Sequence, residues 1–417
     1  MNTKVKAFIL ENWNKTVRTN TADEGSLIGL PEPYTVPCIE GTFQEMYYWD
    51  TYFTNIGLIL SGKIEQAICN TENMAYLIEK YGKMPNGNRT FYLNRSQPPF
   101  FSQAVRDIFE VTGDAEWLDR MYSAAEKEYT FWCENRMTES GLNRYYCDGK
   151  DGFGRGAAEY LCQRCGLDKP NEADIEEYSK CLMSFCESGW DCTSRFDMRA
   201  HEFNALDLNS LLYGMEKNME YFSEVLKNGK SGVWLARAEK RKLLMNSLMW
   251  SEDNSAFYDY DFKRQKISDL FSAASFYPLA FGLATKEQAE KTVACLPKIE
   301  MLYGTAGCEK RNDNRNLQWD YPNGWGCLQY IVIKGLLNYG YRGDALRIAG
   351  KYASLVESNF EKTGTLWEKY NVVTGEVSTA SEYKTPTMMG WSAGVYLYVL
   401  NLTKKLKYRI DYIFEQL

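Results

Sequence analysis

DAEWLDRMYSAAEKEYTFWCENR, residues 114–136, gives the clearest indication of the fold class. Its apolar residues recur near the spacing of an amphipathic helix: Trp117, Leu118, Met121, Ala124, Tyr129, Phe131 and Trp132. The same helical periodicity returns in residues 205–226, 231–249, 327–339, 342–358 and 388–407. The alternation typical of β-strands is rare, and residues 267–271 are ambiguous. The pattern therefore predicts an all-α fold of about a dozen helices.

The domain organisation follows from length and from the absence of linkers. A chain of 417 residues is long for a single core, but closed helical barrels reach this size as one unit. No Pro/Ser linker, low-complexity block or fixed-period repeat divides it. We therefore expect one domain over residues 1–417, with an excursion or lid at residues 147–180. Residues 82–101, 139–160, 303–326 and 371–390 are loops that a helical barrel would gather at one end.

Charge and hydropathy exclude several classes of partner. The 48 basic and 55 acidic side chains give a net charge of −7, and no run of five basic residues occurs. Nucleic acid and anionic membrane surfaces are therefore not expected partners. No run approaches the roughly 20 apolar residues of a membrane span. The apolar stretch at residues 7–10 is too short for a signal-peptide core, which predicts a cytoplasmic protein.

The cysteines suggest reduced thiols. Twelve are scattered along the chain, and only Cys162 and Cys165 form a CxxC pair. A zinc site normally needs a second pair, so the prediction is no metal, although a structural ion at this pair stays open. The single histidine, His201, is interpreted as a structural side chain.

Carboxylates beside indoles give the first indication of chemistry. Four of the eleven tryptophans directly precede an acid, where chance predicts about one or two: Trp49-Asp50, Trp190-Asp191, Trp319-Asp320 and Trp367-Glu368. An indole can desolvate a neighbouring carboxylate and raise its pKa, which suits a general acid. Aromatic rings also pack on the apolar faces of sugars. The pairs therefore point to a saccharide site.

Five loop segments surround these pairs and share Gly, Asn, Arg or Gln with acids and aromatics. They are FQEMYYWDTYF (43–53), PNGNRTFYLNRSQPPFF (85–101), ESGWDCTSRF (187–196), QWDYPNGWGCLQY (318–330) and LWEKYNVVTGEVSTASEY (366–383). In this order, they resemble the motifs of the trehalases, glycoside hydrolases built on an (α/α)6 barrel. The resemblance spans roughly residues 38–400.

The resemblance implies a fold and a pair of catalytic carboxylates. It implies an (α/α)6 barrel with its active-site loops at one end. Asp191 in the SGWD string matches the general acid, and Glu368 in the EKY string matches the general base. Inverting hydrolysis with this pair needs no metal or organic cofactor. The expected partner is a small saccharide substrate.

The remaining motif residues match positions that bind the sugar. They are Phe43, Tyr47, Trp49, Asp50, Asn86, Arg95, Gln97, Gly189, Arg195, Trp319 and Glu382. Asp50 and Asp320 could equally be structural caps. Trp319 and Trp391 could belong to the core.

Three departures bear on the substrate. Thr42 stands where trehalases carry an Arg, the Gly-rich lid before the GEY string is replaced by GEVSTAS, and no good match to an RPES string occurs near residues 154–160. The expected reaction is inverting hydrolysis of a small α-glucoside, above all α,α-trehalose to two glucose molecules. The alternatives are a related glycosidase acting on another small glycoside, or a non-hydrolytic sugar-binding protein on the same scaffold.

Overall fold

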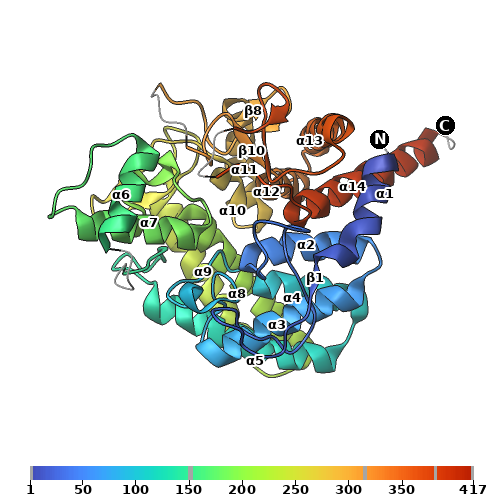
Figure 1. The fold of residues 1–417 in the computed structure, drawn as a ribbon, viewed down its shortest axis with the longest axis horizontal. Coiled ribbons are helices and arrows are strands. Elements are labelled where there is room, and N and C mark those ends of the chain that lie inside the picture. The colour runs from blue at the N-terminus through green and yellow to red at the C-terminus, as the bar shows by residue number, and fades with distance from the viewer. Residues whose placement is uncertain (1–2, 149–153, 313–316, 380–382, 415–417) are drawn as a thin grey trace.

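The fold is described from a computed structural model that covers residues 3–148, 154–312, 317–379 and 383–414 (Figure 1). Its α-helices are α1 (Thr3–Asn12), α2 (Tyr48–Leu60), α3 (Ile64–Tyr81), α4 (Phe101–Thr112), α5 (Ala115–Asn135), α6 (Gly154–Cys165), α7 (Ile175–Ser188), α8 (Leu206–Leu226), α9 (Ser231–Leu248), α10 (Tyr277–Ala280), α11 (Lys286–Ala294), α12 (Gly326–Asn338), α13 (Arg342–Thr363) and α14 (Gly390–Phe414). No helix among these residues has both the length and the apolar character needed to cross a bilayer.

Short strands form small antiparallel sheets between the helices. The strands are β1 (Val17–Arg18), β2 (Tyr34–Thr35), β3 (Phe203–Asn204), β4 (Trp250–Ser251), β5 (Ala256–Phe257), β6 (Tyr260–Asp261), β7 (Lys266–Ile267), β8 (Glu300–Met301), β9 (Gly304–Thr305), β10 (Asn323–Trp325), β11 (Lys369–Asn371) and β12 (Glu376–Val377). Two sheets have three strands, in the orders β3-β6-β7 and β10-β11-β12. In the second sheet Trp325 lies opposite Lys369, which joins two of the motif loops.

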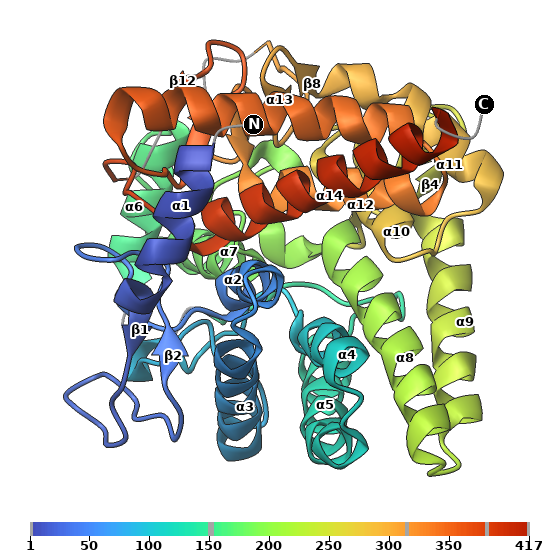
Figure 2. The same cartoon turned by 90° about the vertical axis from the view of Figure 1, so that its right-hand side faces the viewer.

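The helices form an (α/α)6 barrel, as the resemblance implied. Within the described residues, α2, α4, α8, α10, α12 and α14 contact one another in this order, and α14 returns to α2 and closes the ring. Helices that follow the inner ones in sequence pack outside them: α3 against α2, α5 against α4, α9 against α8 and α13 against α12. Figure 2 shows α8 beside α9, and α13 above α14. The inner helices are buried on most sides, which produces one continuous apolar core.

All six segments with helical periodicity form helices, namely α5, α8, α9, α12, α13 and α14, whereas the other described helices were not predicted individually. The segment 114–136 forms α5, and Asp114 caps it by accepting a hydrogen bond from the backbone N–H of Trp117 at 2.9 Å. Two predictions of loops were wrong in part. Residues 48–53 begin α2, and residues 154–160 begin α6. The helix α2 escaped detection because it is buried from Tyr48 to Leu58 and has no polar face.

The segment between α5 and α8 leaves the ring. Its helices α6 and α7 pack on each other, and Figure 1 shows them at the edge of the molecule opposite the two chain ends. The excursion expected at residues 147–180 falls within this segment and stays a prediction. Its action as a lid, and the single-domain organisation of residues 1–417, stay predictions.

The barrel closes through a contact between two glycines. Gly57 in α2 lies so close to Gly394 in α14 that a Cβ on Gly57 would sit 2.7 Å from the Cα of Gly394. A Cβ on Gly394 would lie only 1.9 Å from the carbonyl oxygen of Phe53. Only hydrogen atoms fit between the two helices at this point, so the ring cannot close around larger side chains.

We predict that Gly394→Ala lowers the free energy of unfolding by about 1–3 kcal/mol, because the methyl group overpacks the α2–α14 contact. The matched control is Gly350→Ala in α13, where nothing lies within 4 Å of the added Cβ. That variant should gain roughly 0.4–1 kcal/mol from reduced chain entropy. Denaturant melts of the three proteins measure both values, and equal effects of the two substitutions would contradict the proposed packing.

Candidate active site

A cavity of about 240 Å³ lies where the inner helices begin, and motif segments converge on it. Its walls come from the residues before or at the start of α2, α4, α12 and α14, from the segment after α7, and from Glu368 beside β11. The lining residues are Phe43, Tyr47, Trp49, Asp50, Asn86, Tyr92, Arg95, Gln97, Cys186, Gly189, Asp191, Gln318, Trp319, Trp325, Glu368, Tyr383, Met388 and Trp391. The helix N-termini around it favour negative charge in the cavity.

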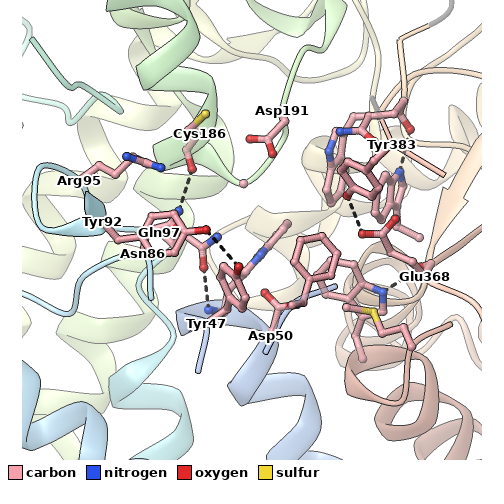
Figure 3. A pocket seen from close by; sticks show the side chains of 18 residues that line it. Tyr47, Asp50, Asn86, Tyr92, Arg95, Gln97, Cys186, Asp191, Glu368 and Tyr383 are labelled. Carbon is pink, nitrogen blue, oxygen red and sulfur yellow. Dashed lines mark hydrogen bonds between the residues drawn. The ribbon is translucent and has the colours of Figure 1, made fainter. Parts of the chain in front are cut away.

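Three carboxylates from distant parts of the chain face this space. Figure 3 shows Asp50, Asp191 and Glu368 around it, with Asn86 and Arg95 on the side away from Glu368. Asp50 lies in the first turn of α2 and is buried. Burial, together with the negative charges of Glu368 and Asp191, raises the pKa of Asp50 to about 8, although a backbone hydrogen bond acts in the opposite direction.

The segment after α7 holds Asp191 in a fixed position. Gly189 has a φ of 71°, and a Cβ there would lie 2.7 Å from the Trp49 ring, so this position requires glycine. Downstream, Asp320 accepts hydrogen bonds from the Thr193 hydroxyl at 2.8 Å and from the backbone N–H of Ser194 at 3.1 Å. The Asp of the QWD string therefore anchors the loop that carries Asp191.

Glu368 is held from several sides. The Trp391 indole donates to its backbone carbonyl at 2.9 Å. Its carboxylate accepts hydrogen bonds from the Tyr383 hydroxyl at 2.7 Å and from the Lys369 ammonium at 2.5 Å. The side chain is only 2% exposed. Its neighbours thus fix both the main chain and the carboxylate of this residue.

Amide and guanidinium groups line the opposite wall. Asn86 donates to the carbonyl of Cys186 at 3.1 Å, and Gln97 accepts from the backbone N–H of Trp49 at 3.3 Å. The guanidinium of Arg95 lies 5.0 Å from the centre of the Tyr92 ring. These groups offer hydrogen-bond donors and acceptors that suit sugar hydroxyls.

An indole cluster forms the base of the site. Trp319 stacks on Trp325 with ring centres 3.8 Å apart and nearly parallel planes. Trp49 and Trp190 lie 5.5 and 5.4 Å from Trp319, and Trp391 lies 6.4 Å from it. The alternative in which Trp319 and Trp391 belong only to the core is therefore incomplete, because both also line the cavity.

The structure brings most of the predicted site residues together, with two exceptions. Arg195 does not line the cavity: its side chain is fully buried and pairs with Asp207 at 2.7 Å and Asp259 at 2.8 Å. Arg195 therefore binds two carboxylates of the protein, although the motif predicted that it binds the sugar. Glu382 lies outside the described residues.

Seven lining residues were not predicted. They are Tyr92, Cys186, Gln318, Trp325, Tyr383, Met388 and Trp391. Gln318, Trp325 and Tyr383 lie inside the quoted motif strings and could have been selected from them. Cys186 and Met388 carry no signal in the sequence, because only the folded chain brings them to the wall.

One cluster of side chains outside the cavity has residue types that can bind a metal ion. Among the described residues, the one grouping of three with suitable spacing is Glu177, His201 and Glu202. Lys180 and Arg199 already pair with its two carboxylates, and Glu177 lies 2.9 Å from His201, which agrees with a structural histidine. Cys162 and Cys165 are both buried.

Comparison with known proteins identifies the family. The family model "Trehalase" matches residues 1–404. A periplasmic trehalase of Escherichia coli O8 is 34% identical over 92% of this chain and 71% of its own length, and one from Xanthomonas campestris B100 is 35% identical over 96% and 73%. The neutral trehalase Nth1 of Saccharomyces cerevisiae superposes with a TM-score of 0.78 at 30% identity, over 96% of this chain and 80% of that one.

A more distant neighbour shares the fold alone. The mannosylglycerate hydrolase of Thermus thermophilus has a TM-score of 0.67 at 15% identity, over 94% of this chain and 99% of that one. The bacterial relatives also correct one expectation. The predicted cytoplasmic location is wrong by this comparison, since these relatives are named periplasmic trehalases. The prediction relied on the apolar stretch at residues 7–10, and the length of that stretch is no measure of location.

Family model, relatives and barrel agree with the motifs that converge on the cavity. This chain belongs to the trehalase family and is a glycosidase.

Proposed function

We propose that this chain hydrolyses α,α-trehalose to two glucose molecules, with inversion at the anomeric carbon that is attacked. The observation that carries the proposal is the meeting of Asp50, Asp191 and Glu368 in one cavity with indole walls. The names of the relatives supply the substrate. Indole faces suit the C–H faces of glucose, and buried carboxylates suit acid–base chemistry.

In the proposed mechanism, two carboxyl groups divide the work. Protonated Asp191 gives its proton to the glycosidic oxygen as the bond to the anomeric carbon breaks. Ionised Glu368 takes a proton from a water molecule, whose oxygen bonds to that carbon from the other face. Because the acid ends ionised and the base protonated, one proton must return to Asp191 and one leave Glu368 before the next turnover.

Asp50 has a different role in this proposal. Its pKa of about 8 keeps it largely protonated at neutral pH. It can then donate a hydrogen bond to a sugar hydroxyl as well as accept one. Asn86, Arg95 and Gln97 would bind further hydroxyls from the opposite wall.

A second candidate is hydrolysis of another small glycoside. Thr42 replaces the Arg expected for trehalose, and its side chain is exposed and does not line the cavity. A panel of disaccharides assayed for glucose release separates the candidates. Trehalose should give the highest kcat/KM. A higher kcat/KM for another glycoside would show that this other glycoside is the preferred substrate. Sugar binding without any hydrolysis would favour a non-catalytic protein.

We predict that Asp191→Asn and Glu368→Gln each lower kcat by about 10²–10⁴-fold, because each removes one proton transfer and keeps the side-chain shape. Glucose release is the measurement. The control is Glu376→Gln on β12, an exposed acid in the same sheet as β11, which should retain full activity. Near-normal activity of either cavity variant, with an unchanged melting temperature, would remove that residue from the mechanism.

The stereochemistry can be read directly from the products. One glucose of α,α-trehalose leaves with its α-configuration, and inversion makes the attacked one β. Proton NMR before mutarotation should therefore show α- and β-glucose in equal amounts. Initial formation of α-glucose alone would indicate a nucleophilic carboxylate and would contradict the role of Glu368 as a base.

We predict that stability falls with rising pH partly because of Asp50. Its folded-state pKa of about 8 exceeds the unfolded value of 3.8. The folded state therefore holds the extra proton between about pH 4 and 8, and stability decreases through this window, by at most about 1.4 kcal/mol per pH unit. Urea unfolding at pH 5 and pH 7.5 should show a smaller decrease for Asp50→Asn than for the parent. Equal decreases would show that Asp50 does not carry this proton.

A further inference from the structure

Lys369 is a buried cation that takes no part in the proposed proton transfers. Its ammonium lies 2.5 Å from Oε2 of Glu368, and its side chain has no exposed surface. The ammonium also lies 4.8 Å from the centres of the Trp325 and Tyr383 rings. Burying an ammonium costs several kcal/mol unless it is paired, so a lysine at this position is stable only beside a negative charge.

The contacts of Lys369 and Tyr383 cover both oxygens of Glu368. Tyr383 donates its hydroxyl proton to Oε1 at 2.7 Å, and Lys369 donates to Oε2. Each carboxylate oxygen has two lone pairs, so each can still accept a proton or a water molecule from the cavity side. The two donors thereby fix the plane of the carboxylate.

Among the described residues, an acid and two thiols also interact electrostatically with Glu368. Asp50 comes from α2, Cys327 from α12 and Cys38 from the segment before α2, and Asp191 in turn interacts with Asp50. Neighbouring carboxyl groups in one cavity do not all ionise, because their negative charges repel. The surroundings of each group therefore determine which of them ionises first. Lys369 contacts only Glu368 among these three carboxylates in the described structure.

Lys369 is set in place by the sheet rather than by the cavity. It begins β11, and its backbone lies opposite Trp325 of β10, the strand that ends the QWDYPNGW string. It does not line the cavity, so substrate does not reach it. Its influence on the reaction must therefore pass through Glu368.

We propose that Lys369 is a positioning residue that selects Glu368 as the ionised carboxylate of the three, while Tyr383 orients it. This inference rests on the proposed function, in which Glu368 acts as the base. Without the ammonium, Glu368 would hold its proton to higher pH and share the negative charge with Asp50 and Asp191. The enzyme would then have its base in the active form only under more alkaline conditions.

The test is the pH profile of kcat/KM for trehalose in the parent and in Lys369→Met, which removes the charge and keeps the length of the side chain. The acidic limb of the profile should move up by roughly one to three pH units, the range for loss of an adjacent opposite charge. KM at the new optimum should change little, because Lys369 does not touch substrate. Lys369→Arg, which keeps the charge, should leave the limb within about half a unit of the parent.

The matched control is Lys351→Met in α13. Lys351 also contacts a glutamate, with Nζ 2.6 Å from Oε1 of Glu300, but neither residue lines the cavity. Its profile should match that of the parent. An unmoved limb in Lys369→Met, or the same movement in Lys351→Met, would overturn the proposal. Tyr383→Phe should lower kcat and move the limb less than Lys369→Met.

A second measurement covers the case in which Lys369→Met does not fold. An unpaired Glu368 would then be the cause, so Lys369→Met combined with Glu368→Gln should regain the melting temperature of Glu368→Gln alone. Failure to regain it would overturn the pairing. The proposed function is tested separately. Full activity of Glu368→Gln would refute the role of Glu368 as the general base. An inactive Glu368→Gln, together with an unmoved acidic limb of the pH profile in Lys369→Met, would refute only the role of Lys369.

Discussion

The stacking of Trp319 is the constraint on which the site depends. Its ring packs face to face with Trp325 and contacts Trp49, Trp190 and Trp391, which come from α2, the segment after α7 and α14. Two of these indoles directly precede carboxylates of the cavity. The side chains of the reaction are therefore positioned by ring packing beneath them, and a change in one ring would displace several segments together.

Electrostatics then divides three similar carboxyl groups. Asp50 is deeply buried and keeps its proton to about pH 8, whereas Glu368 has an ammonium and a hydroxyl on its oxygens. Carboxyl groups of similar chemistry thus have different electrostatic surroundings within one cavity. Asp320 has a different role, because its carboxylate accepts hydrogen bonds from Thr193 and Ser194 and so anchors the segment that follows Asp191.

The periodicity predicted three outer helices, α5, α9 and α13, and three inner helices, α8, α12 and α14, and it missed both inner and outer ones. Helices such as α5 have one polar face, so their periodicity is visible, whereas α2 is buried on all sides and shows none. Site residues within long motif strings were found, but Arg195 shows the limit of this approach. It stands four residues after Asp191, yet the chain turns there and buries it against Asp207 and Asp259, which no motif spacing reveals.

The closure of the ring between α2 and α14 also sets the order in which a nascent chain can complete the protein. About 330 residues separate Leu60 from Gly390, so the α14-facing side of α2 has no partner while they are synthesised. At ordinary ribosome speeds this interval lasts roughly 20–60 s. During that time the apolar side of α2 is exposed to chaperones and to other unfinished chains. The rate of translation therefore affects the yield of folded protein.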